Sequence, residues 1–90
     1  MAPEAIEDLD LLRSDLRAEV RDAIEKFLRY EPTKTSKSRI KRLRGFTRPK
    51  YRLRVNEVRV FYDVVAETVE VLAIVDKATA NEWLERYGEQ

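Results

Sequence analysis

The middle of this 90-residue chain concentrates basic side chains of the kind that bind anions. Between residues 34 and 59 eleven Lys and Arg residues stand against one acid, Glu57, so the segment carries a net charge of +10. The rest of the chain sums to −9 and the whole chain to +1. Because segregated charge creates a strong local field even when the net charge is small, the segment predicts a polyanionic ligand, and first a nucleic-acid backbone.

Three arginines of this segment are predicted to share one face of a β-ribbon. Apolar and polar residues alternate with a period of two across residues 51–55 and 58–63, which indicates two strands joined by a tight turn at Asn56-Glu57. A two-residue loop fixes the register of the pair. Four side chains then project from one face, with Arg54 opposite Arg59 and Arg52 opposite Phe61.

No carboxylate stands beside these arginines in the predicted register. Like charges directly opposite each other destabilise a sheet. Further along the same face Lys50 lies across from Asp63 with Glu70 beyond, so compensating charge is present there and absent here. An external anion supplies the missing charge most simply, because the planar guanidinium fork binds phosphate oxygens in pairs. The alternative is that exposed strand arginines serve solubility and edge protection alone.

The surroundings of the arginines are predicted to be partly apolar. Extending the ladder to a third strand places Leu72 beside Phe61 and Ile74 beside Arg59. The rings of Phe61 and Tyr87 are candidate surfaces for the stacking of bases, which is the usual way of binding single-stranded RNA.

Residues 39–44, upstream of the ribbon, are expected to add a helical turn anchored by Ile40 and Leu43 and ended by Gly45. Its basic residues either contact RNA phosphates or form a solvated helical face: Arg39, Lys41, Arg42 and Arg44.

Two helices are expected to precede this basic segment. Residues 3–12 begin with a proline and early acids, as helices do, and a second helix runs from the cap Ser14 to Tyr30. The break between them favours an antiparallel helical hairpin. The polar segment 31–38 has no periodicity and is predicted to be a loop.

The chain is expected to close with a third strand and a last helix. The strand covers residues 68–75 after a turn at Ala66-Glu67, and the helix covers residues 80–87, with a capping box of Thr79 and Glu82 and a stop at Gly88. Three aromatic residues are expected in the core, with the last packing this helix onto the sheet: Tyr51, Tyr62 and Trp83. The elements predict one α+β domain, in which a helical hairpin packs on a small antiparallel β-sheet with a short C-terminal helix.

Composition narrows the chemistry further. The chain has no Cys and no His, which excludes disulfides, a thiol nucleophile, Cys-based metal sites and the usual general base. Catalysis would therefore use carboxylates, arginine, lysine, tyrosine or hydroxyls, and no cofactor or metal is expected. The sequence shows neither a signal peptide nor an apolar stretch near the roughly 20 residues of a membrane span, so a cytoplasmic location without membrane contact is expected.

Four segments resemble the RelE/ParE superfamily of bacterial toxins. They are the opening Pro3-Glu-Ala-Ile-Glu-Asp-Leu9, the basic stretch Arg39-Ile-Lys-Arg-Leu-Arg-Gly-Phe46, and the two strands Tyr51-Arg-Leu-Arg-Val55 and Val58-Arg-Val-Phe-Tyr62. The corresponding family patterns are a "P-E-A-x-x-D-L" helix, a "K-x-L-x-G" segment and strands of the type "Y-R-[LI]-R" and "[YV]-R-V-[IF]-Y". The similarity spans almost the whole chain, in the same order of elements.

The resemblance implies a toxin of a toxin–antitoxin pair. Members that are similar to RelE enter the ribosomal A site and cut the bound mRNA by attack of the 2′-hydroxyl on the neighbouring phosphate, without a metal. This inhibits translation, and a cognate antitoxin protein neutralises the toxin. Carried over by position, the basic residues of the site fall on Arg52, Arg54, Arg59 and Lys77, and the family's C-terminal tyrosine falls on Tyr87.

Two features depart from the family pattern. The family's first β-strand is expected to be missing, since only Met1 and Ala2 precede the "P-E-A" segment, and the usual "H-R-x-x-x-Y" ending is replaced by a tail with Lys77 and Tyr87. Two other functions therefore stay open: a ParE-like poison of DNA gyrase, and a non-catalytic RNA-binding homologue of the toxins.

Overall fold

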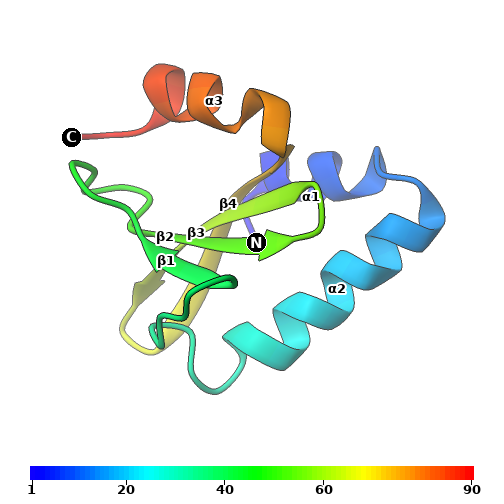
Figure 1. Ribbon diagram of the computed structural model, residues 1–90, viewed down its shortest axis with the longest axis horizontal. Helices are drawn as coiled ribbons and strands as arrows, with labels where there is room; N and C mark the ends of the chain where they lie inside the picture. The colour runs from blue at the N-terminus through cyan, green and yellow to red at the C-terminus, as the bar shows by residue number, and fades with distance from the viewer.

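A four-stranded antiparallel sheet forms the centre of the molecule, in a computed structural model that describes all residues 1–90. The strand order is β1-β2-β3-β4, with β1 (Ile40–Arg42), β2 (Tyr51–Val55), β3 (Val58–Val65) and β4 (Thr68–Asp76). The helices α1 (Pro3–Asp10) and α2 (Ser14–Leu28) cover one face, while α3 (Ala80–Tyr87) covers the other (Figure 1). The predicted α+β class is confirmed, with one strand more than expected. None of the helices combines the length and apolarity needed to cross a membrane.

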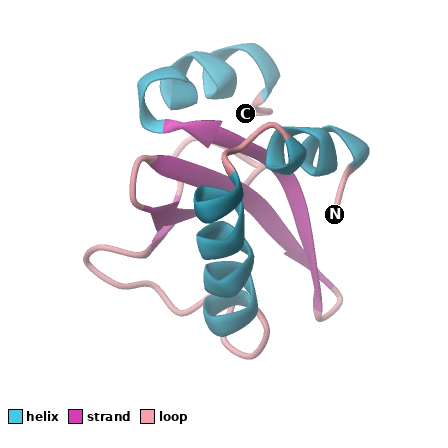
Figure 2. Ribbon diagram, turned by 90° about the vertical axis from the view of Figure 1, so that its right-hand side faces the viewer, coloured by secondary structure: helices cyan, strands magenta, loops and turns pink.

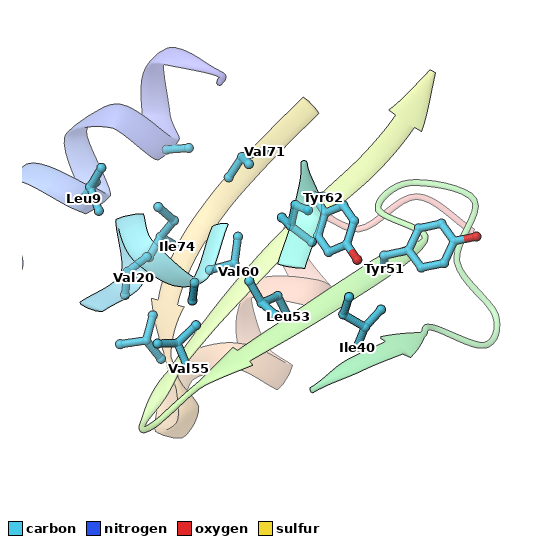
Figure 3. Packing of buried hydrophobic residues seen from close by; sticks show 14 residues of the cluster. Leu9, Val20, Ile40, Tyr51, Leu53, Val55, Val60, Tyr62, Val71 and Ile74 are labelled. Carbon is cyan, nitrogen blue, oxygen red and sulfur yellow. The ribbon is translucent and has the colours of Figure 1, made fainter. Parts of the chain in front are cut away.

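The main core fills the space between the sheet and the two N-terminal helices. Inward-facing side chains of the strands, among them Leu53, Val60 and Tyr62, share this core with Val20 of α2 (Figure 3). The rings of Tyr51 and Tyr62 stack with centroids 5.5 Å apart, and both residues are buried as predicted. Alternation of side chains along each strand sends the residues between them to the opposite face, which carries the candidate site.

The two N-terminal helices follow each other closely in sequence but do not pack side by side. Figure 2 shows α2 running at a steep angle to α1. Helix α1 packs along β4, whereas α2 packs on β2. Because each helix buries its apolar stripe against a different strand of a twisted sheet, the antiparallel packing predicted from the short break is wrong. Ser14 is the first residue of α2 rather than a side-chain cap.

The segment predicted as a helical turn is the edge strand β1. Ile40, Lys41 and Arg42 pair with Leu53, Arg52 and Tyr51 of β2. The turn prediction is wrong because three residues are too few for periodicity to separate helix from strand. Residues 40–42 form a strand because the backbone groups at the outer edge of β2 pair with them, and because Ile40 is then buried in the main core.

A β-bulge shifts the pairing of β3 with β4. Tyr62 pairs with Val71 but Phe61 pairs with Ala73, which leaves Leu72 as the extra residue. The predicted neighbours Leu72 beside Phe61 and Ile74 beside Arg59 are therefore wrong, and Ala73 and Val75 take these places. The extra residue reverses the alternation along β4, so that both Val71 and Ile74 face the main core.

The outer edge of β4 is partly covered by α1. The N–H of Ala2 donates to the carbonyl of Val71 at 2.8 Å, and Asp8 Oδ2 accepts from the N–H of Ile74 at 3.0 Å. These contacts satisfy two backbone groups that an open edge would expose.

The last helix starts differently from the predicted capping box. Asp76, at the end of β4, accepts from the N–H of Thr79 at 2.9 Å and caps the short 3₁₀ helix η1 (Lys77–Thr79) that leads into α3. Thr79 makes no side-chain cap of its own, so the role assigned to Thr79 and Glu82 is wrong. The predicted bounds of the helix itself, 80–87, are confirmed.

Candidate nucleic-acid interface

The β-ribbon brings the predicted arginines together on the face opposite the N-terminal helices. Arg54 of β2 pairs with Arg59 of β3, and Arg52 pairs with Phe61, which confirms the predicted register. Lys41 of β1 pairs with Arg52 on its other side. Since paired residues project to the same face, four cations share this surface. We call Arg52, Arg54 and Arg59 the arginine cluster.

Arg59 is the most constrained member of the cluster. Its side chain is only 8% exposed, and Nη1 donates to the carbonyl of Asn56 at 2.8 Å and to that of Val58 at 3.1 Å. The tight turn thus holds the guanidinium in place. Burial, and next the positive charge of Arg54, lower the pKa of Arg59, while Glu57 opposes this in part. Carbonyl oxygens position this charge without neutralising it.

Arg52 lies half-buried beside it. Its Nε is buried and has no hydrogen-bond partner. Burial is the largest cause that lowers the pKa of Arg52, followed by the positive charges of Arg59 and Arg54. A desolvated guanidinium that faces two like charges gains strongly from an anion nearby.

Arg54 is exposed and completes the cluster. The ion pairs of the structure are Arg13 with Asp15, Arg29 with Glu25, Lys34 with Glu31, and Arg48 with both Glu70 and Glu89. None of them involves the cluster. The negative charges expected to balance the cations further along this face are present in part. Asp63 accepts the backbone N–H of Lys50 at 2.6 Å, and Glu70 forms an ion pair with Arg48.

The aromatic residues on this face are arranged differently from the expectation. Phe61 is 1% exposed, because the ring of Trp83 stacks on it with centroids 5.0 Å apart. It therefore offers no face to a base, and the predicted role of Phe61 in stacking is wrong. The predicted packing of α3 through Trp83 is confirmed. Tyr87 is 60% exposed and lies against Trp83 with centroids 5.7 Å apart, so its ring is accessible.

The arrangement of helices and strands occurs in a solved structure. A chain of the crystal structure of the RelB–RelE antitoxin–toxin complex from Methanococcus jannaschii superposes with a TM-score of 0.71. The superposition covers 91% of this chain and 94% of that chain, at 19% sequence identity. The chain has a RelE-like fold. No family model matches the sequence, and no curated protein matches it either.

Within the RelE-like fold, only one of the two remaining candidate catalytic residues adjoins the arginine cluster: Lys77 precedes α3, whereas Tyr87 is the last residue of that helix. The backbone N–H of Lys77 donates to the carbonyl of Glu57 at 2.6 Å, so Lys77 adjoins the turn that holds Arg59. Tyr87 projects from the last turn of α3, beyond Trp83. Both side chains are exposed. No group of three or more carboxylates is placed to hold a metal ion.

The four cations predicted to bind RNA do not form one surface. Lys41 joins the arginine cluster, whereas Arg42 lies over the ring of Tyr51 on the other face, at 6.0 Å. The guanidinium of Arg39 lies 4.8 Å from the centroid of Phe27, at the end of α2. Arg44 is exposed in the turn after β1. Alternation along β1 explains why Lys41 and Arg42 face opposite ways, whereas Arg39 and Arg44 lie outside the strand.

Three contributors to these surfaces do not follow from the periodic sequence pattern. The turn residue Asn56 was assigned only a conformational role, which its φ of 53° bears out, but its carbonyl also holds Arg59. Phe27 and Tyr30, at the end of α2, lie beside basic side chains. The sequence feature that indicates this second surface is Tyr30, an aromatic residue that lies at the end of the helical pattern and outside its apolar stripe.

Proposed function

We propose that this protein is the toxin of a bacterial toxin–antitoxin pair, an endoribonuclease that cuts mRNA on the ribosome and thereby inhibits translation in the cytoplasm. The observation that carries the proposal is the arginine cluster, three guanidinium groups on one face with no carboxylate partner. The RelE-like fold supports it as an analogy of architecture.

The geometry suggests how the work is divided among the residues. Arg52 and the exposed Arg54 bind the phosphate and the attacking ribose. The 2′-oxygen, whose proton passes to water, bonds to the neighbouring phosphorus while the bond from phosphorus to the 5′-oxygen breaks. Arg59, fixed by two carbonyl groups, stabilises the pentavalent phosphate. Lys77 or Tyr87 assists transfer of a proton to the leaving oxygen, as the chain has no histidine for this step. Charge held in place before reaction costs no reorganisation in the transition state, so no metal is required.

The proposed partner is a cognate antitoxin that covers the arginine cluster. Between α1 and α3 a groove exposes apolar side chains of β4 and α3, namely Leu72, Val75, Trp83 and Tyr87, beside the carboxylates of α1. It reaches the arginine cluster at Val75, which pairs with Arg59. A disordered antitoxin segment could fold across the groove while its acidic residues neutralise the arginines. The ribosome and its mRNA are the other partners of the proposed reaction.

Expression of the chain in cells, followed by mapping of the 5′ ends of transcripts, tests the proposal. New ends inside translated codons are expected, and they should disappear with Arg59→Ala, whose loss of transition-state stabilisation is worth a factor on the order of 100. Intact transcripts together with impaired DNA supercoiling would favour a gyrase poison. Intact transcripts with normal supercoiling would favour a non-catalytic RNA-binding protein.

A further inference from the structure

A second basic surface lies at the end of α2, on the face of the sheet opposite the arginine cluster. There a hollow of about 360 Å³ opens between the helix and the loop that leads into β1. We call it the Tyr30 notch. The side chains that matter for its chemistry are Lys26, Phe27, Tyr30, Lys34 and Arg39.

Cationic side chains lie over both aromatic rings at the Tyr30 notch. The guanidinium of Arg39 and the ammonium of Lys26 lie 4.8 Å and 5.3 Å from the centroid of Phe27. The ring of Tyr30 is 80% exposed and takes part in neither core cluster, and the guanidinium of Arg29 lies 5.5 Å from its centroid. An exposed ring bordered by cations is the pattern that stacks a nucleobase and holds the phosphate next to it.

Charge in the notch is only partly balanced. Lys34 pairs with Glu31 at 3.4 Å, and Arg29 pairs with Glu25. Lys26 and Arg39 have no carboxylate partner. These two cations are therefore available to an anionic ligand.

Hydrogen bonds preform the loop that builds the notch. Ser36 Oγ accepts from the N–H groups of Arg39 and Ile40 at 3.0 and 3.3 Å, and the N–H of Ser36 donates to the carbonyl of Ile40 at 2.9 Å. The hydroxyl of Tyr62 donates to the carbonyl of Pro32 at 2.5 Å, which ties the loop to the core. A preformed surface loses little conformational entropy on binding.

We propose that the Tyr30 notch is a second contact for single-stranded RNA, with a base stacked on Tyr30 and phosphates bound by Lys26 and Arg39. Strand β1 connects it to the arginine cluster, because Lys41 faces the cluster while Arg42 faces the other side. One RNA strand that crosses this edge of the sheet meets cations on both faces. An acidic protein would need the charges but not the exposed ring. The inference rests on the proposed function only in taking RNA as the ligand.

Binding of a fluorescein-labelled, 2′-O-methylated single-stranded RNA, followed by anisotropy at several salt concentrations, tests this inference. Tyr30→Ala should weaken binding about tenfold through the loss of one stacked base. The slope of log K against log salt is negative, and Arg39→Gln should reduce its magnitude by about 0.7, the value of one phosphate contact to a single strand. Tyr30→Phe keeps the ring, and Arg21→Gln removes an exposed charge elsewhere on α2, so both should bind like the wild type.

Unchanged affinity and slope in Tyr30→Ala and Arg39→Gln would overturn the inference, as would equal losses in Arg21→Gln. Poly-glutamate serves as the comparison ligand: if the variants lose its binding and keep that of RNA, the notch binds acidic protein and the inference fails. Methylation blocks the 2′-hydroxyl, so binding is measured without cleavage. Intact mRNA in cells would contradict the nuclease proposal, whereas unchanged RNA binding by the variants would contradict the Tyr30 notch, so the two proposals fail by different measurements.

Discussion

Arg54 of β2 and Arg59 of β3 are direct cross-strand partners, and neither side chain forms an ion pair. Two like charges in this position lower the stability of the sheet. The two side chains therefore repel each other, and an anion bound between the two guanidinium groups would replace this repulsion by attraction.

Removal of one charge from this pair should stabilise the protein. Arg54 is exposed, so Arg54→Gln leaves the core intact and raises the free energy of unfolding by roughly 0.2–1 kcal/mol at low salt. Urea denaturation measures the difference, which should shrink as salt screens the repulsion. A loss of stability at low salt would show that Arg54 has a favourable interaction in the fold.

Tyr62 should make the stability fall at high pH. Burial, with a smaller contribution from Tyr51, raises the pKa of Tyr62 far above its usual value of 10.0. Above about pH 10 the unfolded chain loses this proton while the folded chain keeps it, so unfolding becomes easier as pH rises, by at most about 1.4 kcal/mol per pH unit. Denaturation of the wild type and of Tyr62→Phe across pH 9 to 11 compares the slopes. Equal slopes would contradict the assignment to Tyr62.

The stack of Trp83 on Phe61 should contribute much of the attachment of α3. Trp83→Ala is expected to lower the free energy of unfolding by about 2–4 kcal/mol, because it removes the ring that covers Phe61. Trp83→Phe, which keeps a smaller ring, should lose less. Urea denaturation followed by circular dichroism gives both values, and a loss under about 1 kcal/mol for Trp83→Ala would mean that other contacts hold the helix.

The turn at Asn56 requires a left-handed conformation at φ 53°. Asn56→Ala should therefore lower the free energy of unfolding by about 1–2 kcal/mol. Asn56→Gly accepts the conformation and loses only the exposed contact with Glu19, so its loss should be about 0.5 kcal/mol or less. Equal losses in the two variants would assign the effect to the side chain and not to the backbone.

The sequence predicted the β-ribbon well for a physical reason. Period-two alternation on both sides of a two-residue turn leaves one register, so the pairing of Arg54 with Arg59 followed directly. The bulge that singles out Leu72 could not be predicted, because Leu72 and its neighbours are apolar and suit either face of the sheet.

Other features depended on tertiary contacts that no local pattern encodes. Residues 40–42 form a strand because β2 offers an edge beside them. Trp83 was correctly expected to pack α3 onto the sheet, but the sequence did not show that Phe61 lies beneath it. The result is a candidate site with fewer exposed aromatic residues than expected and with Arg59 more firmly held.

Cleavage of mRNA on ribosomes by the purified protein tests the central claim most directly. With a defined codon in the A site, single-turnover cleavage by the wild type should be at least on the order of 100 times faster than by Arg54→Gln, since Arg54 contacts the reacting phosphate in the proposed site. The control Arg21→Gln should cleave like the wild type. No cleavage by the wild type, or equal rates for the wild type and Arg54→Gln, would contradict the assignment of the arginine cluster as the catalytic site.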